Sequence, residues 1–158
     1  MTWQSLFQAA WVSFFVCAVV GGCGEQTGED GAAGRQQFAE SCEMLRHFVQ
    51  THPNTTIVKF DQEDLNHDGR VDLVVMYRMS EEKNMMRVVL DLGGSYFETN
   101  EVPAPHSNQV IQFRDIDGKP PMEFIVQGMK GAKVGFAVFR IEENQLVDLF
   151  GEGMEDCC

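Results

Sequence analysis

The chain has 158 residues, 44% of them hydrophobic, which is enough for one domain with a modest core. Its formal net charge at pH 7 is −12, and every Asp, Glu, Lys and Arg lies after Gly24. A chain this acidic repels phosphate groups, which excludes nucleic acid as a partner and makes divalent cations natural counter-ions.

Residues 1–22 are uncharged and mostly apolar, and they lead into Val20-Gly21-Gly22-Cys23. This segment resembles a bacterial lipoprotein signal, in which a peptidase cleaves before the cysteine and a lipid is attached to it. The resemblance implies that residues 1–22 are the signal peptide and that Cys23 carries a lipid anchor in a membrane. Met1–Ser5 contains no Lys or Arg, although such signals normally carry a positive charge there. An uncleaved anchor helix and an ordinary secretory signal are therefore the alternatives.

Gly24 after the cysteine resembles lipoproteins that are sorted to the outer membrane of Gram-negative bacteria. The implied location is the cell envelope, at the periplasmic face of that membrane. Residues 24–34 hold four glycines and three acids, a composition that cannot bury a core, so residues 23–34 are predicted to be a flexible tether. Residues 35–158 are then the single folded domain.

Residues 35–51 are predicted to form a helix that ends before His52-Pro53, because proline disfavours helical geometry in the residue before it. Its apolar positions recur at helical spacing: Phe38, Cys42, Leu45 and Val49. After it, short apolar runs alternate with polar turns, which is typical of antiparallel strands. The predicted strands are Thr56–Phe60, Asp72–Met79, Met85–Leu92, Ser95–Thr99, Gln109–Phe113, Glu123–Gln127, Lys133–Ile141 and Leu146–Phe150. The predicted fold class is α+β, with one N-terminal helix packed on an antiparallel meander of about six to eight strands.

The segment 64–72 places oxygen-bearing side chains at its first, third, fifth and ninth positions, and its seventh residue offers a backbone carbonyl. Gly69 allows the tight turn that directs these oxygens inward. Calcium prefers about six to eight oxygen ligands, so the segment is a candidate calcium site. A polar turn that joins two strands without metal is the alternative. The predicted ligands are Asp64, Asn66, Asp68, Arg70 and Asp72.

An EF-hand would carry a glutamate at the twelfth position, where this chain has Val75. The ninth-position aspartate followed by Leu73-Val74-Val75 instead resembles the calcium loops of FG-GAP (integrin-type, VCBS-like) repeats, over about a dozen residues. The resemblance implies the same ligand roles for the five residues named above.

A second, weaker copy of this pattern lies 51 residues further along, where Asp115 corresponds to Asp64 and Glu123 to Asp72. Lys119 stands where the first copy has Asp68, so the second copy is predicted to keep the hairpin and to bind no cation. Two copies cannot close a propeller, so the resemblance concerns the hairpin alone.

The predicted mature chain keeps three further cysteines, and export permits a disulfide. Cys42 is predicted to bond to Cys157 or Cys158; alternatively the adjacent pair bonds to each other and Cys42 is a buried apolar residue. The chain contains no phosphate-binding glycine loop and no nucleophile elbow.

Together these features predict a non-enzymatic envelope lipoprotein with a structural calcium loop, which serves as a binding or assembly module for another envelope protein. The alternative is a thiol- or redox-active periplasmic protein that uses Cys157-Cys158, which requires an exposed thiol of low pKa. A third interpretation is a module that captures another chain along a sheet edge.

Overall fold

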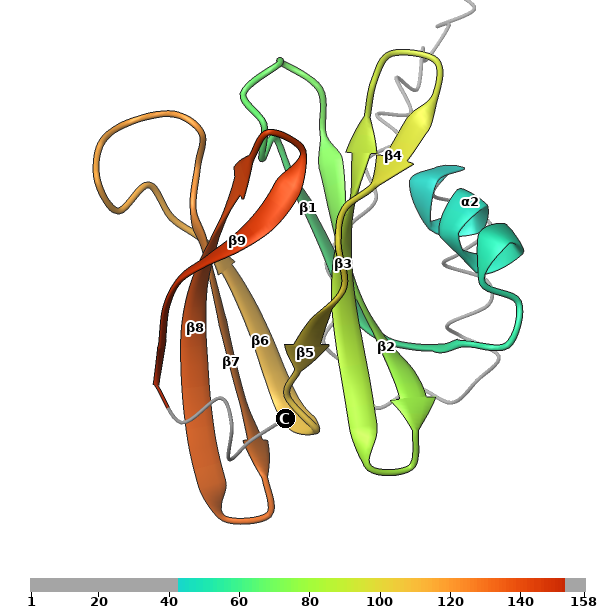
Figure 1. Ribbon diagram of the computed structural model, residues 1–158, viewed down its shortest axis with the longest axis vertical. Coiled ribbons are helices and arrows are strands. Elements are labelled where there is room, and N and C mark those ends of the chain that lie inside the picture. The colour runs from blue at the N-terminus through green and yellow to red at the C-terminus, as the bar shows by residue number, and fades with distance from the viewer. Residues whose placement is uncertain (1–42, 153–158) are drawn as a thin grey trace, which may run out of the picture.

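The computed structural model describes residues 43–152 (Figure 1). The predicted signal peptide, the lipidation site Cys23, the tether, residues 35–42 of the predicted helix and the disulfide candidates Cys42, Cys157 and Cys158 lie outside the described residues. Within 43–152, no helix is long and apolar enough to cross a membrane.

Helix α2, Glu43–Thr51, is amphipathic and ends where the sequence predicts. Met44, Leu45 and Phe48 are buried on its apolar face. The amide of His52 still donates to the carbonyl of Phe48 at 2.9 Å, after which the chain turns away. Burial of this face holds the helix in place, because a helix of nine residues is too short to be stable alone in water.

The described residues form nine strands in two antiparallel sheets. The strands are β1 Thr56–Glu63, β2 Asp72–Ser80, β3 Lys83–Asp91, β4 Tyr96–Glu98, β5 Val102–Ala104, β6 Ser107–Phe113, β7 Phe124–Lys130, β8 Lys133–Glu142 and β9 Gln145–Glu152. Sheet A has the order β1-β2-β3-β4, with β5 also paired to β3, and sheet B has the order β6-β7-β8-β9. The α+β class is confirmed in its coarse form, whereas the predicted single meander of six to eight strands differs from the two sheets observed.

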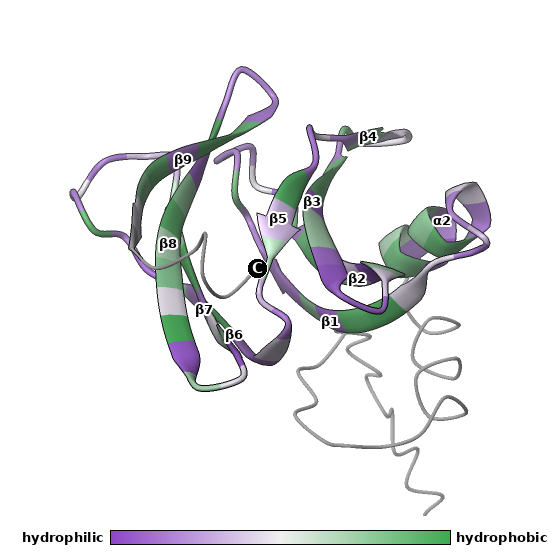
Figure 2. Ribbon diagram, turned by 60° about the horizontal axis from the view of Figure 1, so that its bottom comes forward, coloured by the Kyte–Doolittle hydropathy of each residue, from purple (hydrophilic) through white to green (hydrophobic). Residues whose placement is uncertain are grey.

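Helix α2, sheet A and sheet B are stacked as three layers (Figures 1 and 2). The faces of sheet A therefore both lie in the core, and β2 has six consecutive buried residues, Asp72–Tyr77. Alternate residues of this strand enter different clusters: Val75 packs with α2, while Val74 and Met76 pack towards sheet B. Burial on both faces explains why the strand is continuously apolar after Asp72 rather than alternating.

The two sheets are copies of one four-stranded unit, shifted by 51 residues. Leu73 pairs with Val89 in sheet A, and Phe124, 51 residues after Leu73, pairs with Phe139 in sheet B. The predicted internal repeat thus extends beyond one loop and hairpin to four successive strands in each sheet. In both copies the oxygen-rich segment is the loop between the first two strands, 64–71 in sheet A and 114–123 in sheet B.

Candidate functional site

The first loop is closed by its own polar side chains. The Asp64 carboxylate accepts hydrogen bonds from the amides of Asp68 at 3.1 Å and Gly69 at 2.9 Å. The side-chain oxygen of Asn66 accepts from the same Asp68 amide, also at 3.1 Å. His67 and Gly69 both have positive φ, at 60° and 82°, and they supply the turn. The oxygens of Asp64 and Asn66 therefore converge on one point of the loop.

Arg70 neutralises one carboxylate of this loop and fixes the loop to the end of β3. Its guanidinium donates to Asp68 at 2.5 Å, and its Nε donates to the carbonyl of Asp91 at 2.8 Å. The other Asp68 oxygen accepts the Arg70 amide at 2.9 Å. The sequence predicted a ligand role for the carbonyl of Arg70, but it did not predict that its side chain would pair with Asp68.

Asp72 is fully buried at the base of the loop. One of its oxygens accepts the Leu65 amide and the other accepts the Asp91 amide, each at 3.0 Å. Burial raises the pKa of Asp72 to about 6; the two amide bonds oppose this, and the charges of Asp68 and Asp64 add to it. This carboxylate is desolvated and repelled by its neighbours, so a cation nearby would favour its charged form.

The second loop gathers its acids more tightly. Within residues 43–152, one group of three carboxylates has its ligand oxygens all within 4.8 Å of one another: Asp115, Asp117 and Glu123. Asp64, Asp68 and Asp72 of the first loop do not reach this separation, because loop amides hold each of them. The structure thus places the five predicted ligands in one loop, but it brings the acids of the other loop closer together.

A guanidinium already lies against the second group. Arg140 Nη1 is 3.2 Å from Asp117 and 3.2 Å from Glu123, and its Nη2 is 2.6 Å from Glu142. Only 2% of the Glu123 side chain is exposed. The sequence analysis attributed the loss of cation binding here to Lys119, and it missed Arg140. The pairing of Phe124 with Phe139 would have revealed it, since Arg140 then lies opposite Glu123.

The two loops share one hydrogen-bonded frame. The Leu65 amide donates to Asp72 at 3.0 Å, and the equivalent Ile116 amide donates to Glu123 at 2.9 Å. A further bond is repeated as well, from the Lys119 amide to Asp117 at 2.9 Å, which corresponds to the bond between Asp68 and Asn66. The frames match, so the difference between the loops lies in the charges around them.

The residue opposite the buried acid carries this difference. Continuing the β2–β3 register places Leu90 opposite Asp72, where the second copy has Arg140 opposite Glu123. Leu90 is fully buried in the core between the sheets. The first loop therefore has no counterpart of the guanidinium that balances the buried acid of the second.

A polar cleft of about 560 Å³ is lined by residues from both loops and from the β8–β9 turn. Its polar and charged lining residues are Asn66 of the first loop and Asp117, Lys119, Arg140, Glu142, Glu143 and Asn144. The first loop can thus be reached from solvent on the side that faces the second.

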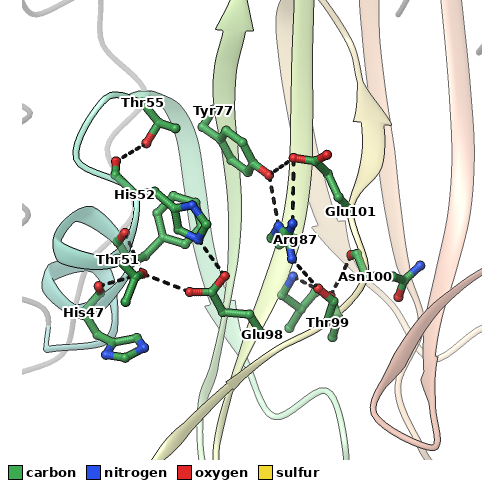
Figure 3. A network of polar contacts seen from close by, with 12 residues as sticks. His47, Thr51, His52, Thr55, Tyr77, Arg87, Glu98, Thr99, Asn100 and Glu101 are labelled. Carbon is green, nitrogen blue, oxygen red and sulfur yellow. Dashed lines mark hydrogen bonds and ion pairs between the residues drawn. The ribbon is translucent and has the colours of Figure 1, made fainter.

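A separate polar network joins α2 to the sheet (Figure 3). His52 bonds to Glu98 at 2.7 Å, and the hydroxyl of Tyr77 donates to Glu101 and accepts from Arg87. Burial, and then the bond to Glu101, raises the pKa of Tyr77 to about 12. Because these groups are paired with one another, we interpret the network as a structural connection between the helix and strands β2 to β5.

No family model matches the sequence, and no curated protein or solved structure is significantly similar to it.

Proposed function

We propose that this chain is a non-enzymatic lipoprotein of the bacterial cell envelope, anchored through Cys23, whose first loop binds calcium and which serves as a binding or assembly module for another envelope protein. One observation carries the cation proposal. The same loop frame occurs twice, and its buried acid contacts a guanidinium in the second copy but only backbone amides in the first. A divalent cation in the first loop would supply the missing positive charge.

The donor set of the first loop suits a hard cation. Calcium takes about six to eight oxygens, and carboxylate, amide and backbone carbonyl oxygens all serve. Each oxygen of Asp64 and Asp72 accepts one amide hydrogen bond, as does the oxygen of Asn66, so each keeps a second lone pair. Asp68 keeps one such oxygen, because its other oxygen already accepts from Asn66 and Arg70. The carbonyl of Arg70 adds a backbone donor.

Calcium here would act on stability rather than on chemistry. Asp72 and Arg70 both bond to the backbone of Asp91, at the end of β3. A cation held by Asp72 and the loop would therefore join the β1–β2 hairpin to β3. Because it binds the folded chain only, calcium at about 100 times its dissociation constant would stabilise the fold by about 2.7 kcal/mol.

Thermal unfolding of the full chain in detergent, followed by circular dichroism, tests the cation proposal. Millimolar calcium added to a chelator-treated sample should raise the melting temperature by several degrees. Asp64→Asn keeps an acceptor for a loop amide and removes a ligand charge, so it should abolish this rise. Asp117→Asn in the second loop is the matched control and should leave the rise unchanged. A wild-type chain whose melting temperature ignores calcium would refute the metal site.

The envelope assignment has its own test. An intact mass spectrum of the native mature protein should show a chain that begins at Cys23 and carries lipid there. The same spectrum counts the disulfides among Cys42, Cys157 and Cys158, and a labelling reagent then reports any reactive thiol. A mature chain that begins elsewhere, without lipid, contradicts the anchor and leaves the cation proposal intact.

A further inference from the structure

The outward face of sheet B, the face turned away from sheet A, is rich in apolar side chains. One cross-strand row of this face runs Ile125, Val138, Phe150, and Phe136 on the same face stacks on Phe150 with ring centroids 5.8 Å apart. Phe150 is 55% exposed and Val134, further along β8, is 53% exposed. An apolar sheet face that meets water over several strands is typical of an interaction surface.

The internal repeat shows what kind of surface fits this face. Val74 and Ile125 are 51 residues apart, and each pairs with a valine on the next strand, Val88 and Val138 respectively. In sheet A the face that carries Val74 and Val88 is buried against sheet B. The outward face of sheet B is thus the counterpart of a face that already packs on a four-stranded sheet.

A second copy of the chain offers only one matching surface among its described residues. Both faces of its sheet A are covered, one by α2 and the other by sheet B (Figure 1). The remaining face is the outward face of its own sheet B. We therefore propose that the chain forms a twofold homodimer in which the outward faces of two B sheets pack against each other.

The charges at the ends of this face set the orientation. Lys130 and Lys133 are exposed at the β7–β8 turn, and Glu142 and Glu143 are exposed at the opposite end, at the β8–β9 turn. A twofold axis perpendicular to the strands places the basic end of each copy over the acidic end of the other. An axis parallel to the strands would pair like charges, which is unfavourable.

The size of the face sets the strength of the dimer. Four strands about 4.8 Å apart, each presenting about seven residues at about 3.3 Å, make a contact of roughly 450 Å² per copy. This is below the roughly 800 Å² per partner of a standard stable interface. The dimer is accordingly weak, so its formation depends on protein concentration in the micromolar range and above.

Sedimentation equilibrium of the full chain, in density-matched detergent with a reductant to exclude disulfide dimers, tests this inference. The wild-type mass should rise from one chain to two between about 1 and 500 μM, the range over which a weak contact of this size associates. Val134→Lys combined with Phe150→Lys places charges on exposed positions of the face and should keep the chain monomeric.

Met79→Lys is the matched control, because Met79 is 53% exposed and belongs to sheet A; it should dimerise as the wild type does. Circular dichroism confirms that each variant is folded. A wild-type chain that stays monomeric at 500 μM overturns the proposal, whether another protein or a terminal segment of the chain covers the face. So does a double variant that still dimerises, or a control that does not.

Discussion

Arg140 is the residue whose replacement tests most directly how the two loops differ. Arg140→Leu gives the second hairpin the residue that the first has at the equivalent place, Leu90. The substitution removes contacts at 3.2 Å to Asp117, at 3.2 Å to Glu123 and at 2.6 Å to Glu142. A leucine can occupy a sheet position of this kind, so the main effect is the loss of charge.

The cost comes chiefly from Glu123. The side chains of Asp117 and Glu142 are 42% and 45% exposed, so water replaces the lost partner and each contributes about 1 kcal/mol or less. Glu123 is only 2% exposed. A buried charge left without its partner costs about 3–5 kcal/mol, and the 22% exposure of the Arg140 side chain reduces this through solvent screening. We expect a total loss of about 2–3 kcal/mol.

Urea unfolding in the presence of a chelator, followed by far-ultraviolet circular dichroism, measures this loss. Glu123→Gln keeps an acceptor for the Ile116 amide and removes the stranded charge. Added to Arg140→Leu, it should therefore restore more than 1 kcal/mol, a coupling typical of residues in direct contact. Calcium should also stabilise Arg140→Leu more than it stabilises the wild type, because the three acids lie within 4.8 Å of one another.

Two results would refute this reasoning. A loss below about 1 kcal/mol that Glu123→Gln does not restore would show that the contact between Arg140 and Glu123 contributes no more than a surface ion pair. Equal stabilisation of the wild type and of Arg140→Leu by calcium would show that the guanidinium does not stand where a cation would bind.

Three further predictions concern stability in urea with a chelator present. The pKa of Asp72 is about 6 when folded and 3.8 when unfolded, so the folded chain binds the extra proton and the free energy of unfolding should fall by about 3 kcal/mol as pH rises from about 4 to 6; a fall that persists in Asp72→Asn contradicts this. Tyr77→Phe should cost about 1–2 kcal/mol because Glu101 loses its donor, and a neutral result would show that water replaces the hydroxyl. Gly128→Ala should cost about 2 kcal/mol or more because its Cβ would lie 2.2 Å from Pro105 Cβ, unless Pro105 moves and stability is unchanged.

The positions of the strands could be predicted from the sequence because turns of Gly, Asp and Asn separate the apolar runs. Their division into two sheets could not. The segment 73–77 was predicted as a strand with one apolar face, yet every residue in it is buried. Pro103 was predicted to interrupt regular structure, whereas it lies in β5 and pairs with Met85. A proline suits an edge position of this kind, because it has no amide to donate to a further strand.

The frame of the first loop was also accessible to sequence reasoning, because its hydrogen bonds join residues that lie at most seven positions apart. Asp64, Asn66 and Asp68 do converge in one turn. The partner of Glu123 was not accessible in this way. Arg140 lies 17 positions away on another strand, and only the pairing of β7 with β8 brings it to the loop.

The two loops show that an acidic turn does not decide by itself whether it needs a cation. The backbone of the turn is set by residues within it, and it is nearly the same in both copies. The charge balance is set across the hairpin, by Leu90 in one copy and by Arg140 in the other. Leu90 belongs to the core between the sheets, so the packing of the two copies fixes that position as apolar in the first. The first loop must then balance the charge of Asp72 from outside the chain, and this requirement follows from packing rather than from the spacing of its acids.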